Sequence, residues 1–348
     1  MTLKVAVVGT GYFSQFHFDA WRRLPGARLV AVCSLEPASL VEAAARHLIP
    51  RQFAEVGAML DATRPDLLDI VTPPAAHLAL LGAASERGVD VICQKPLGGD
   101  LANARVMVRQ AEAAGITLVV HENFRFMPWY REAKRLIDGG TFGRLLDVAF
   151  RLRPGDGQGP RAYLDRQPYF QQMPRFLIHE TAIHLIDVFR YLGGEVAGVF
   201  ARLRRLNPAI RGEDAGQVLL DFTSGAAGLF DGNRLASFPA ANPRLTMGEM
   251  WLDGEAATLR LDGDGRLFLR PHQGVEAEHA YAWHDRDFGG DCVLALQRHV
   301  LAHFQDGAPL ENDGRAYLRN LEIEEAIYRS AASGRWQALP QIEPASSI

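Results

Sequence analysis

Short apolar runs alternate with longer alanine-rich stretches through the first third of the chain. The runs consist largely of Val, Ile and Leu, as buried parallel strands do. They predict strands at Leu3–Val8, Leu29–Cys33, Leu67–Val71, Val89–Cys93 and Leu118–Val120. The stretches between them have helical character, and two end at Gly88 and Gly115, where a glycine can terminate a helix. This alternation predicts βαβ units, a parallel sheet and a ligand crevice at the carboxyl ends of its strands.

The pattern changes after about residue 122. The expected elements are a helix at 128–137, a strand at 145–153, a loop rich in Gly, Pro and Arg at 154–174, a helix at 176–192, strands with hairpin signals from 196 to 284, and two closing helices. We therefore predict an α/β protein of two domains, residues 1–121 and 122–348. The second is an α+β domain with a large, mostly antiparallel open sheet. An apolar outer face of that sheet would form the interface of a homodimer or homotetramer.

The first predicted strand ends in a glycine motif, Gly9-Thr10-Gly11, with Ser14 three residues on. Gly9 permits a tight turn, Gly11 lets a pyrophosphate approach the backbone, and Ser14 is small enough for close helix–strand packing. The helix that follows presents free N–H groups to the phosphates. We predict a dinucleotide cofactor, NAD or NADP, that is contacted by Gly9, Thr10, Gly11, Tyr12, Phe13 and Ser14.

The end of the second strand leaves the choice of cofactor open. Ser34 stands where an acid commonly binds the adenosine ribose, and Glu36 follows two residues later. A serine tolerates a 2′-phosphate that an aspartate would repel, but no arginine follows at once to bind one. We include both residues in the predicted cofactor site.

Composition and charge exclude several classes of function. The 348 residues suit two domains, and 48% hydrophobic with 22% charged residues is ordinary for a soluble globular protein. The net charge of −4 leaves no basic excess for nucleic acid, and no apolar run reaches membrane-spanning length. Cys33, Cys93 and Cys292 share no metal-type spacing and suit reduced thiols of a cytoplasmic protein. We expect a cytoplasmic location and a small-molecule substrate, without a nucleic-acid or membrane partner.

Two further segments carry candidate catalytic groups. Lys95, in Gln94-Lys95-Pro96, follows a predicted strand at the sheet edge where a nicotinamide is expected, and its charge can favour alkoxide character in a substrate hydroxyl. Glu180 and His184 are four residues apart and would share a helix face, and a histidine is a natural proton acceptor near neutral pH. His179 and His184 are about 140° apart around an α-helix, so we expect no shared metal ion.

The segments GTGYFS, VTPPAAH, CQKPL and HETAIHLID, in this order, resemble the Gfo/Idh/MocA family of nicotinamide-dependent oxidoreductases over essentially the whole chain. The resemblance implies a Rossmann domain followed by an α/β domain on an open sheet. It also implies that Lys95 and His184 are the catalytic pair, with Glu180 beside them. Gln94 replaces the family's glutamate, and Glu180 replaces its aspartate. Thr72, Pro73, His77 and Asn123 are implied to line the nicotinamide pocket together with Gln94 and Lys95.

Arginines gather around these segments and indicate an acidic substrate, because arginine binds carboxylates in bidentate fashion. The expected substrate contacts are Lys95, Asn123, Arg125, Arg153, Tyr163, Arg166, Arg175, His179, Glu180 and His184. The sequence thus predicts an NAD(P)-dependent dehydrogenase that oxidises a secondary hydroxyl of a sugar, with a sugar acid favoured. Three alternatives remain open: an oxidoisomerase of a branched sugar acid such as apionate, a redox-assisted glycosidase that uses bound NAD, and a non-enzymatic dinucleotide-binding sensor.

Overall fold

The computed structural model describes residues 2–340, which form two compact units. The first unit contains the chain up to Phe126 together with Asp291–Leu321, and the second contains Met127–Gly290 and the chain from Glu322 onward. The sequence pattern carries no signal for this return of the chain to the first unit.

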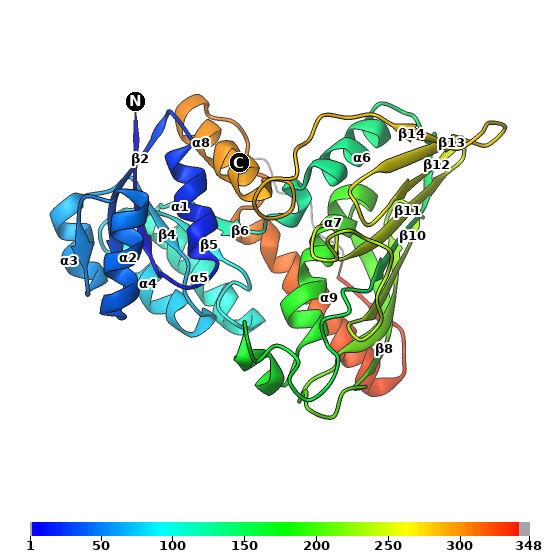
Figure 1. Cartoon of the computed structure of the whole chain (residues 1–348), viewed down its shortest axis with the longest axis horizontal. Helices are drawn as coiled ribbons and strands as arrows, with labels where there is room; N and C mark the ends of the chain where they lie inside the picture. The colour runs from blue at the N-terminus through cyan, green and yellow to red at the C-terminus, as the bar shows by residue number, and fades with distance from the viewer. Residues whose placement is uncertain (1, 341–348) are drawn as a thin grey trace. The chain divides into compact units, whose positions relative to one another are not determined.

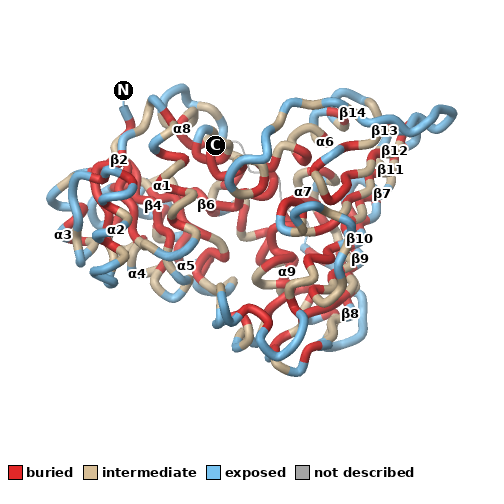
Figure 2. Tube along the Cα trace, viewed as in Figure 1, coloured by how far each residue is buried: buried red, intermediate tan, exposed pale blue. Residues whose placement is uncertain are grey.

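The first unit is built on a parallel sheet of six strands in the order β3-β2-β1-β4-β5-β6. Its strands are β1 (Leu3–Val8), β2 (Ala27–Cys33), β3 (Gln52–Phe53), β4 (Leu67–Ile70), β5 (Asp90–Gln94) and β6 (Leu118–His121). The five predicted strands are confirmed with ends shifted by a residue or two, and only the two-residue β3 was missed. The strands are buried along most of their length (Figure 2), which explains their near-continuous apolar sequences.

Helices surround this sheet, as the alternating pattern predicted (Figure 1). They are α1 (Ser14–Arg22), α2 (Pro37–His47), α3 (Val56–Thr63), α4 (His77–Ser85), α5 (Leu101–Ala114) and α8 (Cys292–Asp306), with the short 3₁₀ turns η1 (Pro74–Ala76) and η2 (Phe124–Phe126). The long helix α9 (Gly314–Ser333) begins in the first unit and ends in the second.

The second unit holds a sheet of nine strands in the order β14-β13-β12-β11-β7-β10-β9-β8-β15. Its strands are β7 (Leu145–Leu152), β8 (Val196–Arg204), β9 (Ala215–Phe222), β10 (Ala227–Asn233), β11 (Gly248–Gly254), β12 (Ala257–Leu261), β13 (Leu267–Pro271), β14 (Ala277–His279) and β15 (Gln337–Ala338). Every pair named in this order is antiparallel except β7 with β10. The fold class predicted from the sequence, a parallel Rossmann sheet plus a mostly antiparallel open sheet, is confirmed.

Within residues 2–340, helices cover one face of the nine-stranded sheet and leave the other uncovered. Helices α6 (Pro128–Asp138) and α7 (Ile183–Gly193) lie on the covered face with the later part of α9 (Figure 1). Burial therefore alternates residue by residue along β9, β10 and β11. The loop before α7 contains the 3₁₀ turn η3 (Pro168–Gln172).

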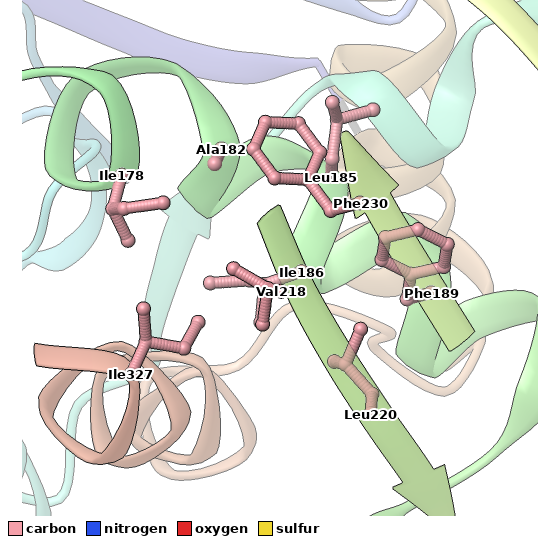
Figure 3. A pocket seen from close by; sticks show the side chains of 9 residues that line it. All are labelled: Ile178, Ala182, Leu185, Ile186, Phe189, Val218, Leu220, Phe230 and Ile327. Carbon is pink, nitrogen blue, oxygen red and sulfur yellow. The ribbon is translucent and has the colours of Figure 1, made fainter. Parts of the chain in front are cut away.

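The helix predicted at 176–192 is only partly α-helical. Leu177–Ala182 forms a π-helical segment, η4, and α7 begins only at Ile183. The apolar side chains of η4 hold it in place. Ile178 and Ala182 point with Val218 of β9, Phe230 of β10 and Ile327 of α9 toward one small apolar cavity (Figure 3). The prediction of a continuous α-helix is therefore wrong for residues 177–182, and these residues do not follow a 3.6-residue period.

Candidate active site

The turn after β1 has the geometry that a dinucleotide requires. Gly9 has a φ of 111°, and a Cβ added to it would lie 2.1 Å from the Val71 carbonyl oxygen, so a side chain does not fit. A Cβ added to Gly11 would have no neighbour within 4 Å, so its backbone is open to a ligand. The buried Ser14 hydroxyl donates to the Gly11 carbonyl oxygen at 2.7 Å and closes the turn. No side chain caps the first N–H groups of α1, and these groups are suited to bind phosphate oxygens.

A pocket of about 170 Å³ adjoins this turn, and its walls include Thr10, Tyr12 and Arg46. The Thr10 hydroxyl lies 2.8 Å from that of Ser34 and 2.7 Å from that of Ser39. The end of β2 therefore offers hydroxyl groups where an acid is common. Glu36 precedes α2 with an exposed side chain. Phe13 packs against Phe16 and His17 of α1 and shapes the turn from the other side. These features fit the predicted dinucleotide.

The loop after β4 is held closed by His77. This residue is fully buried, and its Nε2 lies 2.9 Å from the Thr72 carbonyl oxygen. Burial lowers the pKa of His77, so its ring is uncharged at neutral pH. Pro73 lies exposed between them, before the turn η1. The structure therefore gives His77 a clear role in shaping this loop.

Lys95 follows β5 and is half-buried, as the sequence predicted for a residue at the carboxyl edge of the sheet. Its backbone N–H donates to the side-chain oxygen of Gln94 at 3.0 Å. Asn123 and Arg125 lie just after β6 and are buried by the returning segment of the chain. The Asn123 amide donates to the Cys292 sulfur at 3.2 Å, and the Arg125 guanidinium donates to the Glu311 carbonyl oxygen at 3.2 Å.

In the second unit, the π-helical segment η4 and the start of α7 carry His179, Glu180 and His184. His179 Nδ1 lies 2.7 Å from a carboxylate oxygen of Glu324, which is itself 3% exposed. Glu180 accepts a hydrogen bond from the Thr181 hydroxyl at 2.5 Å. His184 is the second residue of α7 and is 7% exposed. The change from π- to α-helical geometry falls between Glu180 and His184, and such bulges are frequent at functional sites.

Arg234 links this helix to the loop at 155–176. It is buried and donates to Asp156 at 2.9 Å and to the Tyr163 hydroxyl at 2.8 Å, and it also bonds to the Thr181 hydroxyl. Its guanidinium lies 3.7 Å from a carboxylate oxygen of Glu180. Burial acts to lower the pKa of Arg234, but Asp156, Tyr163 and Glu180 together raise it, so the charge is secure.

The arginines expected to bind substrate have partners within the protein. Arg153 pairs with Asp231 and donates to its carbonyl oxygen at 2.6 Å, which joins β7 to β10. Arg175 pairs with Glu325 and stacks over the Tyr328 ring at 4.2 Å. Arg166 lies 3.6 Å from Asp156. Tyr163 contributes its ring to the apolar cluster around Phe170 and Phe176. Burial raises the pKa of Tyr163, so its hydroxyl stays protonated.

His179 and His184 are not on one continuous α-helix, because His179 lies in the π-helical segment and His184 in α7. The 140° separation assumed an α-helix, whereas the hydrogen bonds of a π-helix make each turn longer, so a five-residue spacing brings two side chains closer around the helix. The His179 ring is instead occupied by Glu324. Within residues 2–340 the structure has no group of three or more His, Cys, Asp or Glu side chains placed to hold a metal ion.

Several residues that shape these segments were missed by sequence reasoning. They are His17, Asp69, Asp156, Arg234 and Glu324. Asp69 is a carboxylate inside the buried strand β4, which is a local signal that sequence reasoning could have used. The other four lie in ordinary amphipathic or loop contexts, and their partners are far away in the sequence, so no local pattern identifies them.

Comparisons with known proteins show the family to which the protein belongs. A family model described as "Oxidoreductase family, NAD-binding Rossmann fold" matches residues 3–122, and the Gfo/Idh/MocA C-terminal domain model matches residues 130–260. The protein is therefore an NAD-dependent oxidoreductase with a Rossmann domain. The chain belongs to the Gfo/Idh/MocA family, as the sequence motifs predicted, and the family description names NAD as the nucleotide.

Similar proteins act on sugars. The chain is 34% identical to a D-apiose dehydrogenase of Paraburkholderia graminis over 98% of this chain and 90% of the relative. It is 32% identical to a D-apiose dehydrogenase of Rhizobium rhizogenes over 96% of each. A crystal structure of an oxidoreductase from Agrobacterium radiobacter in complex with NAD+, L-tartaric acid and magnesium superposes with a TM-score of 0.88 at 31% identity, covering 97% of this chain and 98% of that one. The protein is thus a dehydrogenase of a family that acts on sugar hydroxyls. No helix among the described residues is both long and apolar enough to cross a bilayer.

Proposed function

We propose that this protein oxidises a CH–OH group of a neutral sugar of the apiose type with NAD. The observation that carries the proposal is the internal pairing of the arginines: Arg153 and Arg175 are bound to Asp231 and Glu325. A guanidinium already neutralised by a carboxylate is a poor anchor for an acidic substrate. The two D-apiose dehydrogenases, similar over nearly their whole length, support a neutral sugar.

The catalytic roles are those that the family resemblance implies. Bound NAD would supply the acceptor for the hydride that leaves the substrate carbon. His184 takes the proton of the substrate hydroxyl, and Lys95 donates a hydrogen bond to the same oxygen and favours its alkoxide character. Glu180 stands four residues before His184 in the helix and is held by Thr181 and Arg234. The backbone at Gly9–Ser14 and the N–H groups of α1 would bind the pyrophosphate.

The test is a substrate panel followed by absorbance of the reduced nicotinamide. We expect D-apiose and related neutral sugars to be oxidised with NAD, and faster than apionate or L-tartrate. Lys95→Met and His184→Ala should lose activity, whereas the matched surface variants Lys134→Met and His284→Ala should keep it, because both control residues are solvent-accessible. Oxidation of the acids alone would overturn the neutral-sugar proposal.

A hydroxy acid is the second candidate substrate, and one observation favours it. The similar oxidoreductase from Agrobacterium radiobacter was crystallised with L-tartaric acid, a hydroxylated dicarboxylate. Arg166 lies 3.6 Å from its carboxylate partner Asp156, farther than Arg153 and Arg175 lie from theirs. If an acid is the substrate, Arg166→Gln should raise KM for the acid and leave KM for a neutral sugar unchanged.

The same assay separates the three alternatives predicted from the sequence. A dehydrogenase accumulates NADH, whereas a redox-assisted glycosidase cleaves a glycoside without net reduction. An oxidoisomerase accumulates NADH, and NMR of its product shows that the carbonyl group has shifted after the oxidation. A sensor binds NAD without any turnover.

We also propose that the protein assembles through the uncovered face of the nine-stranded sheet. An apolar row crosses that face through paired residues: Leu219 of β9, Leu229 of β10, Ala149 of β7 and Trp251 of β11. Leu219 and Leu229 are 48% and 39% exposed. A second copy of the same sheet would bury this row, because identical surfaces meet in a twofold dimer.

A further inference from the structure

A continuous chain of hydrogen bonds runs from the core of the first unit to Lys95. Asp69, on β4, lies 2.9 Å from Nδ1 of His17 on α1. Nε2 of His17 lies 3.0 Å from the side-chain nitrogen of Gln94. The side-chain oxygen of Gln94 accepts the backbone N–H of Lys95 at 3.0 Å. Asp69 and His17 are fully buried and Gln94 is 9% exposed, so water has little access to these hydrogen bonds.

The donors and acceptors in this series of hydrogen bonds match for only one placement of the His17 proton and one orientation of the Gln94 amide. The Asp69 carboxylate is an acceptor, and the same oxygen also takes the indole N–H of Trp21 at 2.7 Å. His17 therefore carries its proton on Nδ1, which leaves Nε2 as an acceptor. The NH₂ group of Gln94 must then face His17, and its oxygen must face the Lys95 N–H. The buried carboxylate thus sets the orientation of an amide two hydrogen bonds away.

This arrangement accounts for the glutamine that departs from the family motif. Gln94 has to donate on one side and accept on the other, which a carboxamide does without a charge. A glutamate would need one extra proton, on its own carboxyl group or on His17, to make the same two contacts. A second buried charge beside Asp69 would also be costly.

We propose that Asp69 and His17 are positioning residues that fix the carboxamide of Gln94, and that Gln94 in turn fixes the backbone of Lys95. Neither Asp69 nor His17 needs to touch substrate to have this effect. The expected effect on catalysis rests on the proposed role of Lys95. The hydrogen bonds themselves can be tested without any substrate.

Histidine NMR tests the first link. In full-length protein labelled with [¹⁵N]His, the His17 signals are identified by their loss in His17→Asn. We expect a neutral ring at pH 7 with a protonated Nδ1 and an unprotonated Nε2. A proton on Nε2, in either the neutral or the doubly protonated ring, would overturn the proposal.

Lysine NMR tests whether His17 affects Lys95 through Gln94. The sequence has only three lysines, Lys4, Lys95 and Lys134, so [¹⁵N]Lys labelling gives three backbone amide signals. Loss of one hydrogen bond should speed hydrogen exchange of the Lys95 amide about fivefold in Gln94→Met. We expect a similar increase in His17→Asn, although His17 does not contact Lys95. The Lys4 amide, in the same unit and bonded to Asp66 at 2.7 Å, serves as the internal reference.

Controls separate this effect from a general loss of stability. Gln110→Met on α5 and His303→Asn on α8 make the same chemical changes at half-buried positions in the same unit. Neither should alter the Lys95 amide. Equal acceleration at Lys4 and Lys95, or no change at Lys95 in His17→Asn, would overturn the proposal.

Kinetics then separates this inference from the proposed function. Gln94→Met and His17→Asn should lower kcat by about 10- to 100-fold, because small displacements of a catalytic group are costly, while His17→Asn retains the affinity for NAD. If the lysine NMR is as expected but kcat is unchanged, the positioning chain stands and the role of Lys95 in catalysis is wrong. If the Lys95 amide does not respond, the chain is wrong whatever the enzyme oxidises.

Discussion

Replacing Arg234 by methionine removes a buried charge whose partners are still present. The Arg234 side chain is 1% exposed and that of its partner Asp156 is 23% exposed. Loss of one member of a buried ion pair typically costs 3–5 kcal/mol. Because Asp156 has some access to water, we expect the lower end, about 3 kcal/mol of unfolding free energy. Tyr163 and Thr181 also lose the donor that now binds their hydroxyl groups.

Arg260→Met is the matched control. Arg260 belongs to the same unit, pairs with Glu276 at 2.9 Å and stacks over Phe268 at 4.2 Å, but its side chain is 29% exposed. The same substitution should therefore cost less than about 1 kcal/mol. Both arginines pair with a carboxylate and lie over a phenylalanine ring, and they differ in burial and in the two hydroxyl groups that only Arg234 binds.

Urea unfolding followed by tryptophan fluorescence measures both variants. Four of the five tryptophans, Trp129, Trp251, Trp283 and Trp336, lie in the second unit, so the signal reports mainly on it. In a thermal scan, a loss of about 3 kcal/mol corresponds to a fall in Tm of roughly 6–12 °C for a unit of this size. Equal losses in Arg234→Met and Arg260→Met would refute the argument that buried pairing by Arg234 holds this unit together.

Three further predictions concern the turn, a helix cap and the open sheet face. Gly9→Ala should abolish measurable NAD binding by calorimetry, because its Cβ would lie 2.1 Å from the Val71 carbonyl oxygen; unchanged affinity would show that the turn can adjust. Backbone N–H groups of α3 lower the pKa of Glu55, so its stabilising effect is present at neutral pH and lost as the pH falls through that lowered pKa. Urea midpoints of wild type and Glu55→Gln should thus differ at pH 7 and converge in acid, and a constant difference would contradict the cap. The double variant Leu219→Lys, Leu229→Lys should reduce the mass found by light scattering to that of a monomer. An unchanged oligomeric mass would show that the protein does not assemble through this face.

The parts of the fold that are local in sequence could be predicted. The five predicted strands of the parallel sheet are mainly apolar runs, and each run carries its own signal whatever its partners are. The return of Asp291–Leu321 to the first unit was not predictable, because it depends on contacts such as Asn123 with Cys292. Those contacts are between residues far apart in the chain, and neither partner has a distinctive local pattern.

The candidate site divides in the same way. Gly9 and Lys95 each come directly after an apolar strand, so the sequence predicts their positions at the end of a strand. The arginines differ: Arg153 and Arg175 were expected to contact substrate, and the structure pairs them with Asp231 and Glu325. A charge counted along the sequence has no known partner, and only the fold tells whether it is available to a ligand.

The π-helical segment shows why a motif can be found in the sequence while its geometry is not predicted. The residues from His179 to His184 were identified from their order, which does not depend on helix type. Their relative directions do depend on it, and here Glu180 is turned toward Arg234 while His179 is turned toward Glu324. Both partners come from elements later in the chain, β10's end and α9, so the wider turn is stabilised by tertiary contacts rather than by helix propensity. Identity of the site residues is thus a local property of this sequence, and their orientation is a property of the whole second unit.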